Sequence, residues 1–206
     1  MTNYFLHIEG MDLAGKSTVA KCFASTSQIN WVIQDKRLSK NNPVYDFAWN
    51  FGKKAGYDKD VLGFLYLAAL LQDIKTFKRE HHVIQDSTLL LRSLNYYMTV
   101  RKNEHLVASF KRCIPNHPRP DASFYLTADV ETRRKRLKER INSNPEKLTS
   151  MDLLIQKDPK KFIQIDESLQ ALSIDTFNSK VINTSKMTSF EVVQYIREHC
   201  HAEMQR

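Results

Sequence analysis

A glycine-rich stretch near the N-terminus constrains this chain more than any other feature. Residues 10–18 read Gly-Met-Asp-Leu-Ala-Gly-Lys-Ser-Thr and fit the pattern G-x-x-x-x-G-K-[ST] of phosphate-binding loops. The apolar run at residues 4–8 predicts a short buried strand before the stretch, and residues 17–25 predict a helix after it. Strand, glycine loop and helix in this order are the context that the motif requires. We therefore expect a nucleotide-binding P-loop.

Each position of the loop has an expected role. Glycines let the backbone curl so that successive N–H groups converge on anionic oxygens, and the following helix adds the partial positive charge of its N-terminus. Lys16 is expected to reach the β- and γ-phosphates as a catalytic cation, and the Ser17 hydroxyl to bind Mg²⁺. The predicted ATP-binding residues of the loop are Gly10, Ala14, Gly15, Lys16, Ser17 and Thr18.

The composition indicates one globular domain with an anionic ligand. The chain has 206 residues, of which 42% are hydrophobic and 26% charged, values ordinary for a globular domain. Its net charge of +8 suits nucleotides, and would also suit nucleic acid. The three cysteines have no C-x-x-C spacing, which favours a reduced, cytoplasmic setting. We expect no signal peptide before Tyr4, and the apolar run 64–71 is too short to span a bilayer. We predict a buried core helix there and no membrane partner.

Short apolar runs alternate with helical patterns along the rest of the chain. Further strands are expected at residues 30–33, 82–86, 121–127 and 180–183, and further helices at residues 44–56, 60–78, 89–114, 130–141, 162–177 and 190–199. This alternation predicts a doubly wound α/β fold, with a five-stranded parallel sheet and helices on both faces. One kinase-type domain would span residues 1–206, with a turn at 142–145 and a helical lid at about 141–161.

Three acidic residues are expected near the carboxyl ends of these strands, where such sheets bind ligands. Asp86 ends the third strand and is a candidate Mg²⁺ ligand beside Ser17, although a solvated turn or helix cap would also use an aspartate. Asp12 could orient the phosphate acceptor as a catalytic residue, or could form an Asx-turn that stiffens the loop. Glu9 could bind the acceptor or accept backbone N–H bonds.

The predicted helix 130–141 is strongly basic. Arg133, Arg136 and Arg140 share a face at i, i+3 and i+7, where guanidinium groups could stack on a base or clamp phosphates. A charge run of this kind is more often a solvated face. The polar segment that follows has the character of a lid, which would exclude water from phosphoryl transfer.

These residues together resemble the thymidylate kinase-like nucleoside and nucleotide kinases. That family carries F-E-G-x-D-G-x-G-K-S-T, which residues 8–18 match closely. It also carries P-D-x-x-x-Y-L-x-x-x-x-E-x-x-x-x-R-x-x-x-R, whose fixed positions here are Pro120, Asp121, Tyr125, Leu126, Glu131, Arg136 and Arg140. The resemblance implies an ATP- and Mg²⁺-dependent kinase in which Arg136 lies on the adenine side of ATP and Arg140, a catalytic candidate, points toward the lid.

The acceptor half departs from the family pattern. The R-E-P-G motif is absent, with Lys36-Arg37 as a rough stand-in, and D-R appears as Asp86-Ser87. The A-A-D-R motif appears as Ala-Ala-Leu-Leu at residues 68–71. Arg92, on the helix after Asp86, is a candidate replacement for the missing arginine. The predicted acceptor-binding residues are Glu9, Arg37 and Arg92.

The sequence thus favours phosphoryl transfer from ATP·Mg²⁺ to a small acceptor, a thymidylate-like nucleoside monophosphate or a nucleoside. The alternatives are a kinase-like protein with another acceptor or no turnover, and a nucleic-acid-dependent ATPase. A regulatory GTPase is disfavoured because no N-K-x-D occurs. We expect no nucleic-acid partner. A homodimer stays open, because aromatic residues of the 44–56 helix could line an acceptor pocket or a dimer surface.

Overall fold

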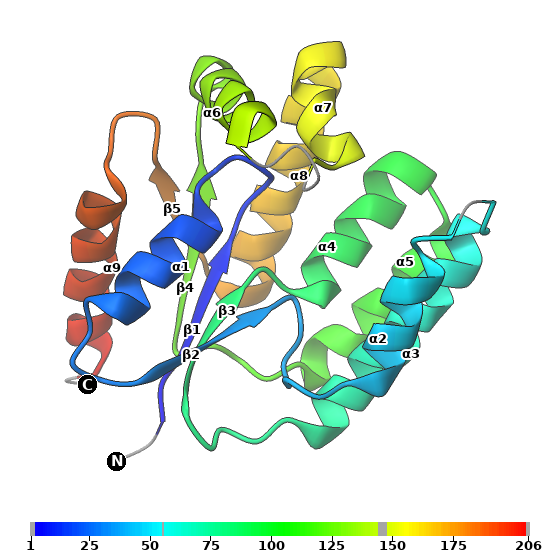
Figure 1. Cartoon of the computed structure of the whole chain (residues 1–206). Coiled ribbons are helices and arrows are strands. Elements are labelled where there is room, and N and C mark those ends of the chain that lie inside the picture. The colour runs from blue at the N-terminus through cyan, green and yellow to red at the C-terminus, as the bar shows by residue number, and fades with distance from the viewer. Residues whose placement is uncertain (1–2, 55, 144–147, 205–206) are drawn as a thin grey trace.

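Five parallel strands form the centre of the molecule, as predicted (Figure 1). The computed structural model describes residues 3–54, 56–143 and 148–204. The strands are β1 (Phe5–Glu9), β2 (Trp31–Asp35), β3 (His82–Asp86), β4 (Ala122–Thr127) and β5 (Lys180–Asn183), in the spatial order β2-β3-β1-β4-β5. All neighbouring pairs are parallel. The carboxyl ends of the strands therefore meet at one edge of the sheet, which is where a ligand is expected.

The central strand β1 shows why this chain forms a parallel sheet. All five of its residues are buried, because β3 and β4 flank it and helices cover both of its faces. Ile8 lies opposite Asp86 on one side and Phe124 on the other, so the residues that end β1 and β3 come together. On the other side of β3, Asp35 at the end of β2 is also opposite Asp86. This register places the carboxylates of two strands next to the P-loop.

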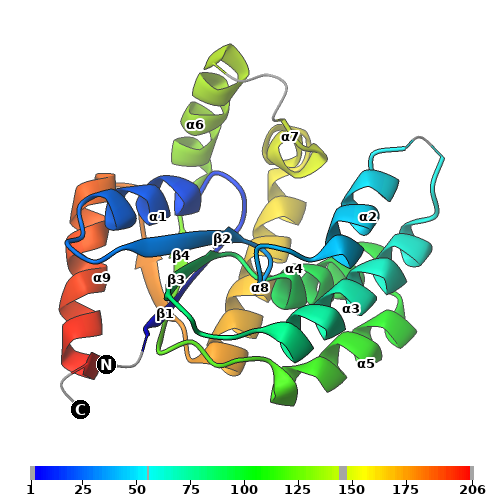
Figure 2. The ribbon, with the colours of Figure 1, turned by 60° about the horizontal axis from the view of Figure 1, so that its bottom comes forward.

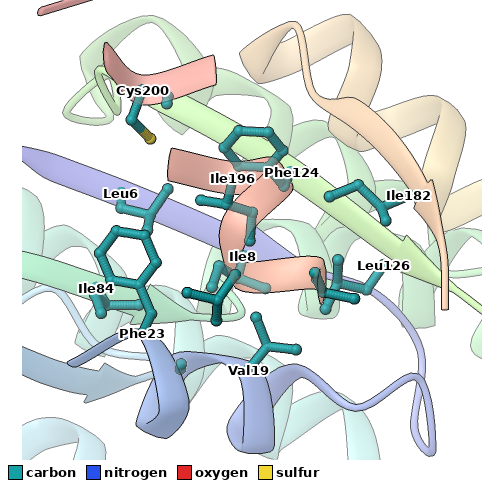
Figure 3. Close-up of a cluster of buried hydrophobic side chains, with 14 of the residues drawn as sticks. Leu6, Ile8, Val19, Phe23, Ile84, Phe124, Leu126, Ile182, Ile196 and Cys200 are labelled. Atoms are coloured by element: carbon teal, nitrogen blue, oxygen red, sulfur yellow. The ribbon is translucent and has the colours of Figure 1, made fainter. Parts of the chain in front are cut away.

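Helices cover both faces of the sheet, which confirms the doubly wound arrangement (Figure 2). Helices α1 (Lys16–Ser25) and α9 (Ser189–Met204) pack together on one face. Figure 3 shows the core beneath them, where Leu6 and Ile8 of β1 meet Val19 and Phe23 of α1. The other face carries α2 (Pro43–Phe51), α3 (Lys59–Thr76), α4 (Leu89–Tyr96), α5 (Glu104–Cys113) and α8 (Pro159–Phe177).

The single helix predicted at 89–114 is wrong in one respect, because it breaks near its middle. After α4 the chain makes a π-helical turn, η1 (Tyr97–Arg101), and Lys102 adopts a left-handed conformation with φ of 54°. The side chain of Asn103 then accepts a hydrogen bond from the N–H of Leu106 and caps α5. A 3-10 turn, η2 (Ile114–Asn116), ends this region.

The apolar run at residues 64–71 is only partly the buried core helix that we predicted. Ala69 and Leu70 are buried in α3, but Phe64 is 51% exposed and Leu71 is 52% exposed. The run is apolar on more than one face of the helix, so packing against α2 and α5 leaves an outer stripe uncovered. Over the described residues, no helix has both the length and the apolar character needed to cross a bilayer.

The predicted lid is helical in its described part (Figure 2). It runs from the end of α6 (Val130–Ser143) through α7 (Ser150–Lys157) to the start of α8. Thr149 and Asp152 form a capping box that begins α7. Helix α8 begins at residue 159, before the predicted start, because Asp158 caps it and Pro159 occupies its first turn. The turn predicted at 142–145 is wrong in its first half, because residues 142 and 143 are the last residues of α6. Its second half, residues 144 and 145, lies outside the described residues.

Candidate active site

The P-loop connects β1 to α1 and has the curled backbone that phosphate binding needs. Gly10 has φ of 147°, and a Cβ at this position would lie 2.2 Å from the carbonyl oxygen of Leu126, so only glycine fits. Leu13 and Gly15 are left-handed, with φ of 67° and 95°. Gly15 is the N-cap of α1, so the first N–H groups of that helix face the loop.

Two cavities flank the loop. The first, here called the P-loop cavity, has a volume of about 470 Å³ and is lined by Asp12, Leu13, Gly15, Lys16, Ser17, Thr18, Lys21, Asp35, Lys36, Asp86, Ser87, Arg92 and Arg140. The second, here called the α6 cavity, has a volume of about 410 Å³ and lies between the loop, α6 and the start of α9. Ala14, Gly15 and Thr18 line it together with Arg136, Arg140 and Thr184. The loop therefore offers a site on each of its two sides.

Ser17 and Asp86 come together as predicted for a magnesium site. The hydroxyl of Ser17 donates to Oδ2 of Asp86 at 2.5 Å. Burial raises the pKa of Asp86, and the nearby Lys16 only partly opposes that effect. A hydroxyl and a carboxylate are oxygen donors of the kind that Mg²⁺ takes when it keeps several waters and binds substrate phosphates. The residues present therefore fit Mg²⁺, although their role as ligands stays a prediction.

Lys16 lines the P-loop cavity. Its ammonium donates to the carbonyl oxygen of Met11 at 3.2 Å. Burial, together with the charge of Arg92, lowers the pKa of Lys16 below its ordinary value, while Asp86 and Asp12 oppose that shift. A poorly solvated ammonium that donates to one backbone carbonyl among the described residues is well placed to bind phosphate oxygens.

Asp12 forms an ion pair with Arg92. Nη2 of Arg92 lies 3.0 Å from Oδ1 of Asp12, and Nη1 of Arg92 donates to the carbonyl oxygen of Gly10 at 3.2 Å. Burial would raise the pKa of Asp12, but the charges of Arg92 and Lys16 more than offset it and bring the pKa to about 2. Thr149 of the lid also reaches the second carboxylate oxygen, at 3.5 Å. Asp12 is therefore an ionised hydrogen-bond acceptor between the loop, α4 and the lid.

Glu9 does not face either cavity, which corrects its assignment as an acceptor-binding residue. Its side chain is fully buried and accepts from the N–H of Gly10 at 3.0 Å and of Thr88 at 2.9 Å. Burial opposes ionisation, but interaction with His7 and the charges of Arg92 and Lys16 lower the pKa of Glu9 to about 2. Glu9 thus ties the P-loop to the start of α4, which is the backbone role that the sequence left open.

Arg37 also lies away from the P-loop cavity, and its neighbour Lys36 lines the cavity in its place. Arg37 pairs with Asp46 at 3.0 Å and lies over the ring of Tyr45. Lys36 has φ of 59°, and its N–H donates to the carbonyl oxygen of Asp86 at 3.1 Å. Its ammonium lies 5.6 Å from the ring centre of Trp49. Of these two neighbouring cations, it is therefore Lys36, and not the predicted acceptor-binding residue Arg37, that lines the P-loop cavity.

The three arginines of the predicted basic face have different surroundings. Arg136 donates to the carbonyl oxygen of Leu13 at 2.9 Å and to Thr184, and it lines the α6 cavity, on the side predicted for adenine. Arg140 lines both cavities, and its Nη1 lies 2.6 Å from the buried carboxylate of Asp152 in the lid. Arg133 is buried, which corrects the expectation of a single solvated or ligand-facing stripe.

Comparison with known proteins now identifies the family. The sequence model described as thymidylate kinase matches residues 8–195. This chain belongs to the thymidylate kinase family. As a member of the thymidylate kinase family it is a kinase, and it transfers a phosphoryl group to a nucleoside monophosphate or a nucleoside.

Individual relatives of this thymidylate kinase family member are distant. A probable thymidylate kinase of Methanocaldococcus jannaschii is 26% identical over 193 residues, which is 92% of each chain. The structure of a thymidylate kinase from Candida albicans covers 98% of this chain and 93% of its own, with a TM-score of 0.66 and 16% identity. A deoxyadenosine kinase from M. mycoides, solved with dCMP and dCDP bound, covers 96% of this chain and 99% of its own, with a TM-score of 0.63 and 17% identity. At these identities the two structures support the nucleotide-kinase fold alone.

Proposed function

We propose that this thymidylate kinase family member transfers the γ-phosphoryl group of ATP·Mg²⁺ to a nucleoside monophosphate. The observation that carries the proposal is the position of two cations, Lys36 and Arg92, in the P-loop cavity. They come from the end of β2 and from α4, whereas the P-loop and α6 supply the residues expected to hold ATP. A second set of cations on the far side of the loop suits a second phosphate group.

The donor is expected to lie across the P-loop, with its adenine toward the α6 cavity. Arg136 and Thr184 line that cavity, and Lys16 and Arg140 line the P-loop cavity. In this proposal Lys16 and Arg140 bind the transferred phosphoryl group. Ser17 and Asp86 would hold Mg²⁺, which neutralises charge on the phosphates during transfer. Positioning and charge stabilisation supply most of the catalysis in this type of reaction.

The ionisation of Asp12 and its ion pair with Arg92 also favour an acceptor that already carries a phosphate. A nucleoside must lose a hydroxyl proton during transfer, and a carboxylate with a pKa of about 2, paired with Arg92, is a weak general base. A monophosphate acceptor is itself anionic and needs cations more than it needs a base. Arg92 would then hold the acceptor phosphate through N–H groups other than the one that binds Asp12.

One observation favours a nucleoside as the second candidate acceptor. Asp35, at the end of β2, also lines the P-loop cavity and lies opposite Asp86 in the register. A carboxylate there could accept the proton of a sugar hydroxyl.

The test is phosphoryl transfer from ATP·Mg²⁺ to a panel of nucleosides and nucleoside monophosphates, with thymidylate as the first member. Lys36→Met is expected to raise KM for the monophosphate about tenfold, through loss of a charge-assisted hydrogen bond, and to leave KM for ATP unchanged. Lys40→Met is the matched control, because Lys40 is an exposed lysine that does not line the P-loop cavity. Transfer to nucleosides alone, unaffected by Lys36→Met, would contradict the monophosphate proposal and support Asp35 as a base.

We also propose that the protein forms a homodimer through the outer face of α3. Val61, Phe64 and Leu71 are 48%, 51% and 52% exposed and share one face of the helix at i, i+3 and i+10. A contiguous apolar stripe of this kind is typical of an interface, and a two-fold axis would bring two copies of it together.

Sedimentation velocity tests the dimer. Phe64→Asp is expected to give monomers at concentrations where the unaltered protein is dimeric, because a buried carboxylate pair would oppose association. Phe190→Asp is the matched control, because Phe190 is 54% exposed at the start of α9. A monomeric unaltered protein would refute this proposal and leave the proposed kinase activity untouched.

We propose the reducing cytoplasm as the cellular location. Among the described residues Cys22, Cys113 and Cys200 form no disulfide, and a reducing compartment keeps thiols in that state.

A further inference from the structure

Arg133 is the largest fully buried side chain of the described residues, with 1% of its surface exposed. Its Nε donates to the carbonyl oxygen of Ala128 at 2.8 Å. One terminal nitrogen donates to the carbonyl oxygen of Asp12 in the P-loop at 2.7 Å. The other donates to Thr127 at 3.2 Å and to the carboxylate of Asp166 at 2.7 Å. One guanidinium therefore joins α6, β4, α8 and the P-loop.

Asp166 anchors this guanidinium. It lies on α8, and its side chain is 13% exposed. The carboxylate of Asp166 also accepts two further hydrogen bonds. The phenol of Tyr125 donates to Oδ1 at 2.6 Å, and the hydroxyl of Thr127 donates to Oδ2 at 3.1 Å. A buried ion pair is tolerated when its remaining hydrogen-bonding groups are satisfied in this way, and such a network is rigid.

The bond to the carbonyl oxygen of Asp12 fixes the direction of a peptide group in the loop. The carbonyl of Asp12 and the N–H of Leu13 belong to one trans peptide and point in opposite directions. Holding the carbonyl against Arg133 therefore directs the N–H of Leu13 away from α6. Arg136 holds the next carbonyl, that of Leu13, at 2.9 Å. Two arginines one helical turn apart on α6 thus bind two consecutive carbonyl groups of the P-loop.

The loop needs this restraint because of Leu13. Its φ of 67° is in the left-handed region, where a leucine is strained because its Cβ approaches the backbone. A residue in such a conformation keeps it only when its surroundings enforce it. The side chain of Leu13 is buried in a cluster with Met11 and Leu137, and this packing holds the side chain in place. The guanidinium groups of Arg133 and Arg136 fix the peptide groups on either side.

We propose that Arg133, anchored by Asp166, is a positioning residue that holds the P-loop in the conformation that receives ATP. It acts through the backbone of Asp12 and Leu13 and does not touch the nucleotide. The inference rests on ATP as the donor of the proposed function.

The first test is Arg133→Lys. Lysine keeps a positive charge beside Asp166, but its single ammonium cannot reproduce the fork that binds Asp166 and the Asp12 carbonyl together. KM for ATP is expected to rise about tenfold, as for one lost hydrogen bond to a charged group, while KM for the phosphate acceptor stays within twofold. A merely structural role would lower the melting temperature and the active fraction, and would leave KM for ATP unchanged.

A second variant removes the ion pair as a unit. Arg133→Met combined with Asp166→Asn leaves no unpaired buried charge, so it is expected to fold. Titration calorimetry with ATP and Mg²⁺ should show binding weakened about tenfold or more. Arg134→Met, on the exposed neighbour of the same helix, should bind ATP like the unaltered protein.

Unaltered affinity and KM for ATP in both Arg133 variants would overturn the inference. An equal loss in Arg134→Met would also overturn it, because the effect would then come from the general charge of α6. If the unaltered protein itself does not bind ATP, the proposed function fails, which is a separate result.

Discussion

Replacing Lys16 with alanine is expected to lower kcat by about 100- to 1,000-fold, the range seen when one preorganised charge-stabilising group is removed. The ammonium lies in the P-loop cavity with only the carbonyl of Met11 as a hydrogen-bond partner within the described residues. It is therefore available to the transferred phosphoryl group, and alanine supplies no substitute. Steady-state kinetics with saturating ATP·Mg²⁺ and acceptor measure the effect.

The same substitution is expected to leave stability unchanged or slightly higher. Folding lowers the pKa of Lys16, mainly by burial, so the charged ammonium opposes folding at neutral pH. A lower kcat with an equal or higher melting temperature would identify a functional charge, because the loss could not come from unfolding. Lys138→Ala, on the exposed side of α6, is the control for loss of a lysine. Unchanged turnover in Lys16→Ala would refute the assignment of the P-loop.

The sheet and the P-loop could be predicted because their signals are local. The glycine pattern, the buried strand before it and the helix after it lie within residues 4–25. Each predicted strand is four to seven residues long and contains at least two consecutive apolar residues. The donor side of the site follows from the same segment. Ser17 and Asp86 could be paired because the carboxyl ends of parallel strands meet at one edge.

The choice between Lys36 and Arg37 could not be made from the sequence. Side chains alternate along a strand, so a shift of one residue sends a cation to the opposite face. The predicted strand ended at Ile33, whereas β2 continues to Asp35 and Lys36 then takes a left-handed conformation. Which of the two cations lines the cavity depends on the backbone conformation after β2, and neither composition nor residue spacing predicts that conformation.

The burial of Arg133 could not be predicted from the sequence for a different reason. Arg133 lies four residues before the buried Leu137, so helical periodicity places it on the core side of α6, but an arginine there resembles part of a solvated basic face. Its partner, Asp166, is on another helix 33 residues later. Only the three-dimensional structure brings the two charges together, so pairing of this kind is beyond a reading of local sequence.

Asp86→Asn is expected to raise the Mg²⁺ concentration for half-maximal activity and to lower kcat, each by about 10- to 100-fold, as is typical when a metal ligand or its support is changed. The amide has the size of the carboxylate but lacks its charge, so it would hold the Ser17 hydroxyl and bind the ion weakly. Measuring initial rates across a Mg²⁺ titration at saturating ATP separates the two effects.

Asp35→Asn is the matched variant, because Asp35 lines the same cavity one strand away. The Mg²⁺ dependence of Asp35→Asn should be that of the unaltered protein. An equal shift in both variants would mean that the overall charge of the cavity sets the dependence, and not direct binding of Mg²⁺ by Asp86.

Folding raises the pKa of Asp86, chiefly by burial, so the ionised carboxylate lowers stability at neutral pH. Removing that charge in Asp86→Asn should therefore raise the melting temperature. Lys16 and Asp86 would then share one property, a charge that opposes folding and is retained because phosphoryl transfer requires it.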